Sequence, residues 1–86
     1  MKLNPKYILR EVAGETLLVS LADLNSAKRL LCLNELGKDI YFHLQKGLSK
    51  EDIFAALLEE SEVEPEVLQA DLDAFLATLK EYGVIV

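Results

Sequence analysis

The sequence contains few of the residues that carry most protein chemistry. Its 86 residues include one cysteine, one histidine, one methionine and no tryptophan. A single cysteine, Cys32, cannot form an internal disulfide, which agrees with a reducing cytoplasm. A zinc site needs three or four ligands, and no His/Cys cluster supplies them. We therefore expect a cytoplasmic protein without disulfide, metal or cofactor.

Long apolar segments are also missing. No run approaches the roughly 20 residues that cross a bilayer, and the first residues, Met1 to Pro5, lack the apolar stretch of a signal peptide. A chain of 86 residues has room for one core. Hydrophobic residues make up 51% of the chain, which is enough to form that core. The sequence predicts one folded domain over residues 1–86, with no membrane partner.

Basic residues are absent from most of the C-terminal half. Residues 1–50 hold eight Lys/Arg and five Asp/Glu, whereas residues 51–79 hold nine Asp/Glu and no Lys/Arg. Proteins that bind nucleic acid neutralise phosphates with Lys and Arg, so this pattern argues against a nucleic-acid partner. A solvated acidic surface that keeps a small domain soluble explains the same pattern equally well.

What the sequence does contain is a clear order of secondary structure. Segments rich in β-branched and large apolar residues predict a hairpin with a type II′ turn at Gly14-Glu15, then a turn-like segment at 22–27 and a short third strand. Apolar residues at helical spacing then predict three helices. The predicted strands cover residues 7–13, 16–21 and 29–33, and the predicted helices cover residues 34–46, 49–61 and 65–82. The expected fold is α+β, a three-stranded sheet packed on a three-helix bundle, winged-helix-like in outline.

The expected helix ends carry recognisable capping residues. Asn34 and Ser49 are preferred N-caps, because their side-chain oxygens accept from an unpaired N–H of the first turn. Glu64, before the third helix, is a poor cap. Gly47 and Gly83 suit the C-terminal ends of the first and third helices.

The expected third helix has two apolar faces. At about 100° per residue, a core stripe contains Leu68, Leu72, Phe75, Leu76 and Leu79. A second stripe of mostly small side chains contains Val67, Ala70, Ala74, Ala77 and Thr78. The second stripe is either ordinary helix-forming sequence or the wall of a groove. The short third strand, if it lies at a sheet edge, presents unpaired backbone groups that can accept another strand.

The order and spacing of these features resemble the PqqD family, the coenzyme PQQ synthesis protein D type, whose members are also called RiPP recognition elements. The resemblance covers about residues 30–86 and departs mildly at Lys38, Tyr41 and Glu64. The matching motifs are Leu33–Gly37, Gly47, Ser49–Ile53, Val63–Glu66 and Tyr82–Ile85.

The resemblance implies a non-catalytic peptide chaperone. Such a protein binds the leader of a ribosomally made precursor peptide and presents it to a modifying enzyme, often a radical SAM enzyme. In the family the leader adds as an antiparallel strand to the third strand, in the cleft beside the third helix. The implied peptide-binding residues are Arg29, Leu30, Leu31, Cys32, Leu33, Val67, Ala70, Asp71, Ala74 and Thr78.

Three alternatives remain open at this stage. A winged-helix DNA binder is disfavoured by the acidic third helix. An enzyme would have to use the Asp39–His43 pair, which lies one helical turn apart with no nucleophile implied beside it. A general protein–protein adaptor differs only in its partner. The exposed strand also leaves a homodimer open.

Overall fold

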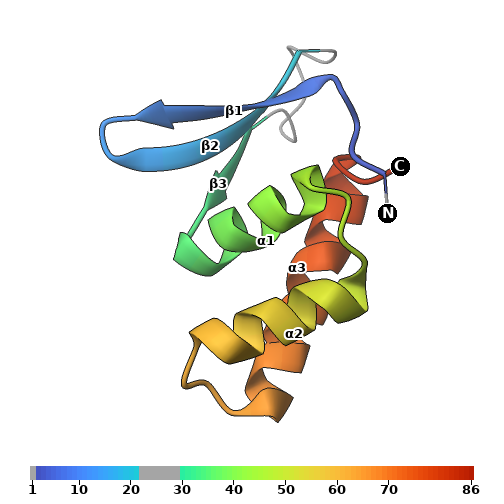
Figure 1. Ribbon diagram of the computed structural model, residues 1–86. Helices are drawn as coiled ribbons and strands as arrows, with labels where there is room; N and C mark the ends of the chain where they lie inside the picture. Colours follow the sequence, from blue (N-terminus) through green and yellow to red (C-terminus); the bar gives the residue numbers. More distant parts are fainter. Residues whose placement is uncertain (1, 22–29) are drawn as a thin grey trace.

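In the computed structural model the chain forms a three-stranded sheet followed by three helices (Figure 1). The structure describes residues 2–21 and 30–86. The expected α+β class is confirmed, and each element begins and ends within one residue of its predicted range. The expected turn at 22–27 and the first residue of the expected third strand, Arg29, lie outside the described residues. The elements are β1 Tyr7–Val12, β2 Glu15–Ser20, β3 Leu30–Leu33, α1 Glu35–Gln45, α2 Lys50–Glu60 and α3 Pro65–Tyr82.

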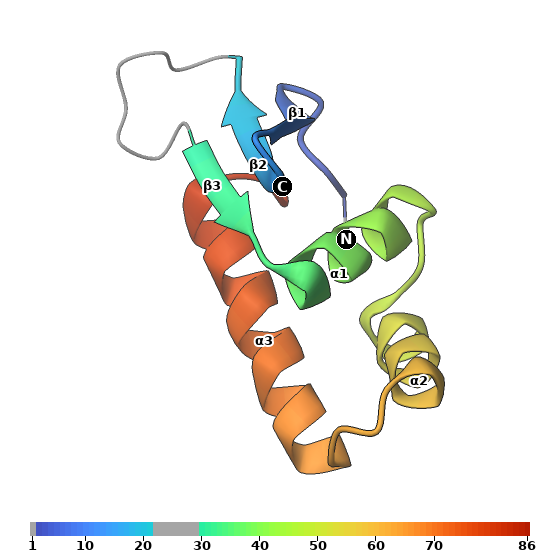
Figure 2. The ribbon, with the colours of Figure 1, turned by 90° about the vertical axis from the view of Figure 1, so that its left-hand side faces the viewer.

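The sheet is antiparallel, in the order β1-β2-β3. On β2 the buried face carries Thr16, Leu18 and Ser20, whereas Leu17 and Val19 are half-buried on the other face. Leu18 pairs with Leu31 of β3, so these two side chains lie on the same face of the sheet. That face packs against the helices. β3 then leads directly into the first turn of α1, with α3 passing beside that junction (Figure 2).

The turn between β1 and β2 differs from the prediction. The register pairs Val12 with Glu15, so the two turn residues are Ala13 and Gly14, not Gly14 and Glu15. Their φ angles are 54° and 82°. A type I′ turn needs positive φ at both positions, whereas the predicted type II′ turn needs it only at the first. The type II′ prediction was wrong because the strands pair one residue earlier than expected.

We expect an Ala13→Asn substitution to stabilise the protein. The left-handed conformation is sterically unfavourable for alanine, whereas asparagine tolerates it. Asn-Gly is also a preferred pair of residues in type I′ turns. The free energy of unfolding should rise by about 0.5–1 kcal/mol, measured by urea denaturation. Glu15→Asn, one residue beyond the turn, is the control and should give no such gain.

The helix ends follow the capping prediction. The Asn34 side-chain oxygen accepts from the Gly37 N–H at 2.8 Å, and the Ser49 hydroxyl accepts from the Asp52 N–H at 3.2 Å. Glu64 makes no side-chain cap bond. α3 ends at Gly83, whose φ of 80° places it in the left-handed conformation that glycine favours.

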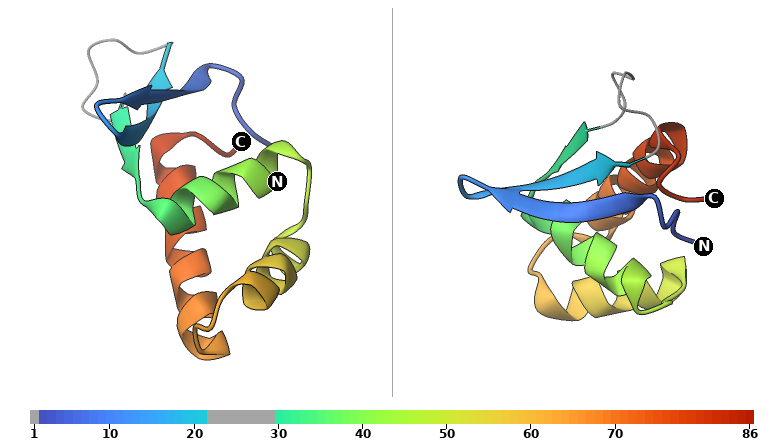
Figure 3. Two further views of the ribbon diagram at one scale, coloured as in Figure 1. Left: turned by 60° about the vertical axis from the view of Figure 1, so that its left-hand side comes forward. Right: turned by 90° about the horizontal axis from the view of Figure 1, so that it is seen from above.

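The two ends of the chain hold the sheet against the helices. The Asn4 N–H donates to the Val84 carbonyl at 2.7 Å, and the Tyr7 hydroxyl donates to the Tyr82 carbonyl at 2.5 Å. Leu3 forms an antiparallel bridge with Ile85, and Figure 3 shows the termini side by side. These bonds fix the N-terminal end of β1 to the C-terminal end of α3.

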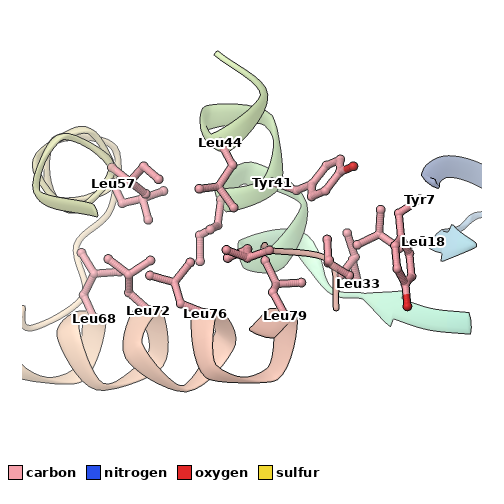
Figure 4. Close-up of a cluster of buried hydrophobic side chains, with 14 residues drawn as sticks. Tyr7, Leu18, Leu33, Tyr41, Leu44, Leu57, Leu68, Leu72, Leu76 and Leu79 are labelled. Carbon is pink, nitrogen blue, oxygen red and sulfur yellow. The ribbon is translucent and has the colours of Figure 1, made fainter. Parts of the chain in front are cut away.

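One hydrophobic core joins all six elements. Figure 4 shows the leucines of α3 facing Leu44 of α1 and Leu57 of α2, with Leu33 and Leu18 of the sheet at the other end. The α3 residues in this core are Leu68, Leu72, Leu76 and Leu79. None of the helices in the described ranges has the length and apolarity that a membrane crossing requires.

Candidate functional site

β3 is an edge strand. Within residues 2–21 and 30–86 only β2 pairs with it, so its other edge meets no described strand. Adjacent residues of an antiparallel strand turn their N–H and C=O groups alternately toward one neighbour and the other. The four residues Leu30–Leu33 therefore direct the backbone groups of two residues away from β2.

A hollow of about 290 Å³ lies at the junction between β3 and α1. We call it the α1–α3 hollow. One side comes from the first turn of α1 and the other from the middle of α3 (Figure 2). Its lining mixes apolar carbon with an amide, a carboxylate and a hydroxyl. The lining residues are Asn34, Leu36, Gly37, Asp71, Ala74, Phe75 and Thr78.

The shape of this hollow depends on a close approach between two helices. Gly37 is buried in the first turn of α1 and faces the ring of Phe75 on α3. A Cβ atom at position 37 would lie 2.9 Å from Cε1 of that ring and 3.2 Å from the Asn34 side-chain oxygen. Both distances are shorter than ordinary van der Waals contacts. Glycine thus permits α1 and α3 to come this close.

The structure brings together only part of the implied binding surface. Asp71, Ala74 and Thr78 line the α1–α3 hollow, which is also lined by Asn34, the residue that follows β3. Leu33 is only 6% exposed, so it can offer a partner its backbone but little side chain. Val67 and Ala70 are exposed and do not line this hollow.

Asn34, Leu36, Gly37 and Phe75 line the hollow but were not among the predicted site residues. Phe75 was expected in the core stripe of α3, yet it is only half-buried. It follows Asp71 by one turn and lies about 40° from it around the helix axis, at the border between core and hollow. Ala70 lies about 40° from Ala74 in the direction away from Phe75, which explains why it is left outside.

The carboxylates of α3 differ in their surroundings. Asp73 forms an ion pair with Lys50 and accepts a hydrogen bond from Gln69 at 3.1 Å. The pKa of Asp73 is lowered, and the main cause is its hydrogen bond with Lys50. Asp71 lines the hollow on the other side of the helix and has no ion-pair partner among the described residues. Its negative charge is therefore available to a ligand.

The residues considered for catalysis form no recognisable active site. Nδ1 of His43 is buried without a hydrogen-bond partner, so that nitrogen does not pair with Asp39. Cys32 is a free, exposed cysteine on β3. The described residues contain no group of three or more His, Cys, Asp or Glu side chains arranged to hold a metal ion.

The candidate site therefore combines a sheet edge that meets no described strand with a hollow walled by the last helix of a small α+β domain. The chain belongs to the coenzyme PQQ synthesis protein D (PqqD) family, whose model matches residues 15–85. Its fold is also that of TbiB1, solved in complex with the TbiA(beta) leader peptide. The two structures superpose with a TM-score of 0.81 at 24% identity, over 98% of this chain and 93% of that one. No curated protein matches the chain.

Proposed function

We propose that this chain is a RiPP recognition element, a non-catalytic domain that binds the leader of a ribosomally made precursor peptide. The leader adds as an antiparallel strand to the open edge of β3, and its side chains enter the α1–α3 hollow. The observation that carries this proposal is that β3, whose outer edge meets no described strand, ends at a hollow lined by Asp71, Ala74 and Thr78. Membership of the PqqD family and the leader peptide bound to the similarly folded TbiB1 support it.

The energetics require both parts of the surface. Two outward-facing residues of β3 offer about four hydrogen bonds, and each contributes about 0.5–1.5 kcal/mol net. Their sum of about 2–6 kcal/mol falls short of the roughly 8 kcal/mol of a micromolar complex. Apolar side chains in the hollow supply the remainder at about 25 cal/mol per Å² buried. The leader should therefore carry aliphatic or aromatic anchors.

The bound leader is then presented to a modifying enzyme in the cytoplasm, and we propose a radical SAM enzyme as that partner. The domain itself carries out no chemical step. The same open edge could pair with β3 of a second copy, so a homodimer competes for the surface. Leader binding and self-association should then exclude each other.

The direct test begins with the short open reading frames beside the gene for this chain. The N-terminal segment of each encoded peptide is labelled and titrated against the protein by fluorescence anisotropy. One segment should bind with a micromolar or lower Kd, and binding should slow amide exchange in β3. If every segment fails to bind, or binds without protecting β3, strand addition at this edge is excluded.

A further inference from the structure

A second hollow of about 290 Å³ lies next to the first along α3. It shares Leu36 and Asp71 with the α1–α3 hollow, so the two hollows are neighbours, and we call them together the groove. We call the second hollow the three-helix hollow, because each helix contributes one leucine and one carboxylate to its lining. The leucines are Leu36, Leu57 and Leu68, and the carboxylates are Asp39, Glu60 and Asp71.

Among the described residues, none of these three carboxylates is paired with a basic side chain. Asp39, Glu60 and Asp71 are all exposed. Glu60 is also the last residue of α2, and the last turn of that helix contains no basic residue. Carbonyl groups at a helix C-terminus favour a cation, so the end of α2 adds to the negative potential of the carboxylates.

The direction of an added strand determines which part of a peptide reaches this hollow. β3 runs from Leu30 to Leu33 and ends beside the α1–α3 hollow. A peptide antiparallel to β3 passes Leu33 before Leu30, so its residues N-terminal to the paired segment point past Asn34 into the groove. The α1–α3 hollow comes first on that path, and the three-helix hollow follows.

We infer that the three-helix hollow binds an arginine of the leader, N-terminal to the segment that pairs with β3. This inference rests on the proposed function. The arginine stem covers the leucine floor, because long basic side chains lay their methylenes on apolar surface. The guanidinium then meets the carboxylates, and its planar fork pairs with them better than the ammonium of lysine does.

A phage-displayed random peptide library, panned against the full chain, tests this inference. Binders are first sorted by whether Ala74→Arg, in the α1–α3 hollow, abolishes their binding. Among the sensitive peptides, arginine should be enriched on the N-terminal side of the apolar anchors. A synthetic peptide from this group should bind about 10-fold more weakly when its arginine is replaced by leucine.

Neutralising the hollow should remove the arginine preference. A triple variant, Asp39→Asn with Glu60→Gln and Asp71→Asn, should bind the arginine peptide about 10-fold more weakly and should not distinguish it from the leucine peptide. A control variant, Glu15→Gln with Glu51→Gln and Glu59→Gln, changes the charge equally at exposed positions outside both hollows. It should retain the preference. If the triple variant does not fold, Asp39→Asn alone takes its place. This single variant should also bind the arginine peptide more weakly than wild type does.

The outcomes separate this inference from the proposed function. Sensitive peptides without an enriched arginine, or an arginine preference that survives the triple variant, would overturn the inference and leave leader binding intact. A library in which no binder is sensitive to Ala74→Arg would overturn both. Arginine enriched on the C-terminal side of the anchors would overturn the inference, because it contradicts the antiparallel path into the three-helix hollow.

Discussion

An Ala74→Arg variant is expected to fold normally and to lose leader binding. Ala74 is exposed on α3, and arginine is almost as good a helix former as alanine, so the free energy of unfolding should change by less than about 0.5 kcal/mol. The new side chain points across the α1–α3 hollow, where Asp71, three residues earlier, can hold its guanidinium. The leader anchor and the arginine then compete for the same space. Affinity should fall at least about 30-fold, or about 2 kcal/mol, in an anisotropy titration.

Ala77→Arg is the matched control. It adds the same side chain to an exposed position of the same helix, but Ala77 lines a different hollow together with Lys50 and Lys80. The two variants have equal net charge, so a general electrostatic effect would appear in both. Affinity for the leader should stay within about twofold of wild type in Ala77→Arg. Equal loss in both variants would show that charge, rather than occupancy of the groove, causes the effect.

The fold was predictable because its elements depend mainly on local sequence. Asn34 and Ser49 each accept a hydrogen bond from a residue three positions later, and Gly83 ends α3 through its own backbone conformation. None of these interactions needs information from another element. The faces of β2 were harder, because Leu17 and Leu18 make both faces apolar. Burial of Leu18, together with Thr16 and Ser20, is decided by which face meets the helices.

The candidate site was only partly predictable, because it is formed between elements. The alanine stripe of α3 contains Ala74 and Thr78, which line the α1–α3 hollow, and their position on the helix depends on spacing alone. Phe75 looked like a core residue, because helical spacing cannot show how far a neighbouring helix covers each side chain. The contact between Phe75 and Gly37 joins residues that are 38 positions apart in the sequence. A glycine at position 37, within the first turn of the predicted first helix, was the available signal for that close approach.

The approach of α1 to α3 yields the second large effect. Replacing Gly37 with leucine should lower the free energy of unfolding by up to about 2 kcal/mol, because overpacking an interior typically costs about 1–3 kcal/mol and the better helix propensity of leucine offsets about 1 kcal/mol of that cost. The added side chain meets the Phe75 ring at its first carbon, so the helices must separate or the ring must turn into the α1–α3 hollow. Either response changes the shape of the groove. Leader affinity should therefore fall at least about 10-fold as stability falls.

Gly37→Ala separates the two causes. Its single methyl group meets the outer edge of the Phe75 ring and the Asn34 side-chain oxygen, and a shift of a few tenths of an ångström in each relieves the contact. The helix propensity of alanine exceeds that of glycine by about 1 kcal/mol, so the net change in the free energy of unfolding should be close to zero. The displaced ring still narrows the hollow, and the loss of leader affinity should lie between wild type and Gly37→Leu. Urea denaturation and anisotropy titration of both variants measure these effects, and a Gly37→Leu protein as stable and as tightly binding as wild type would show that this glycine does not control the groove.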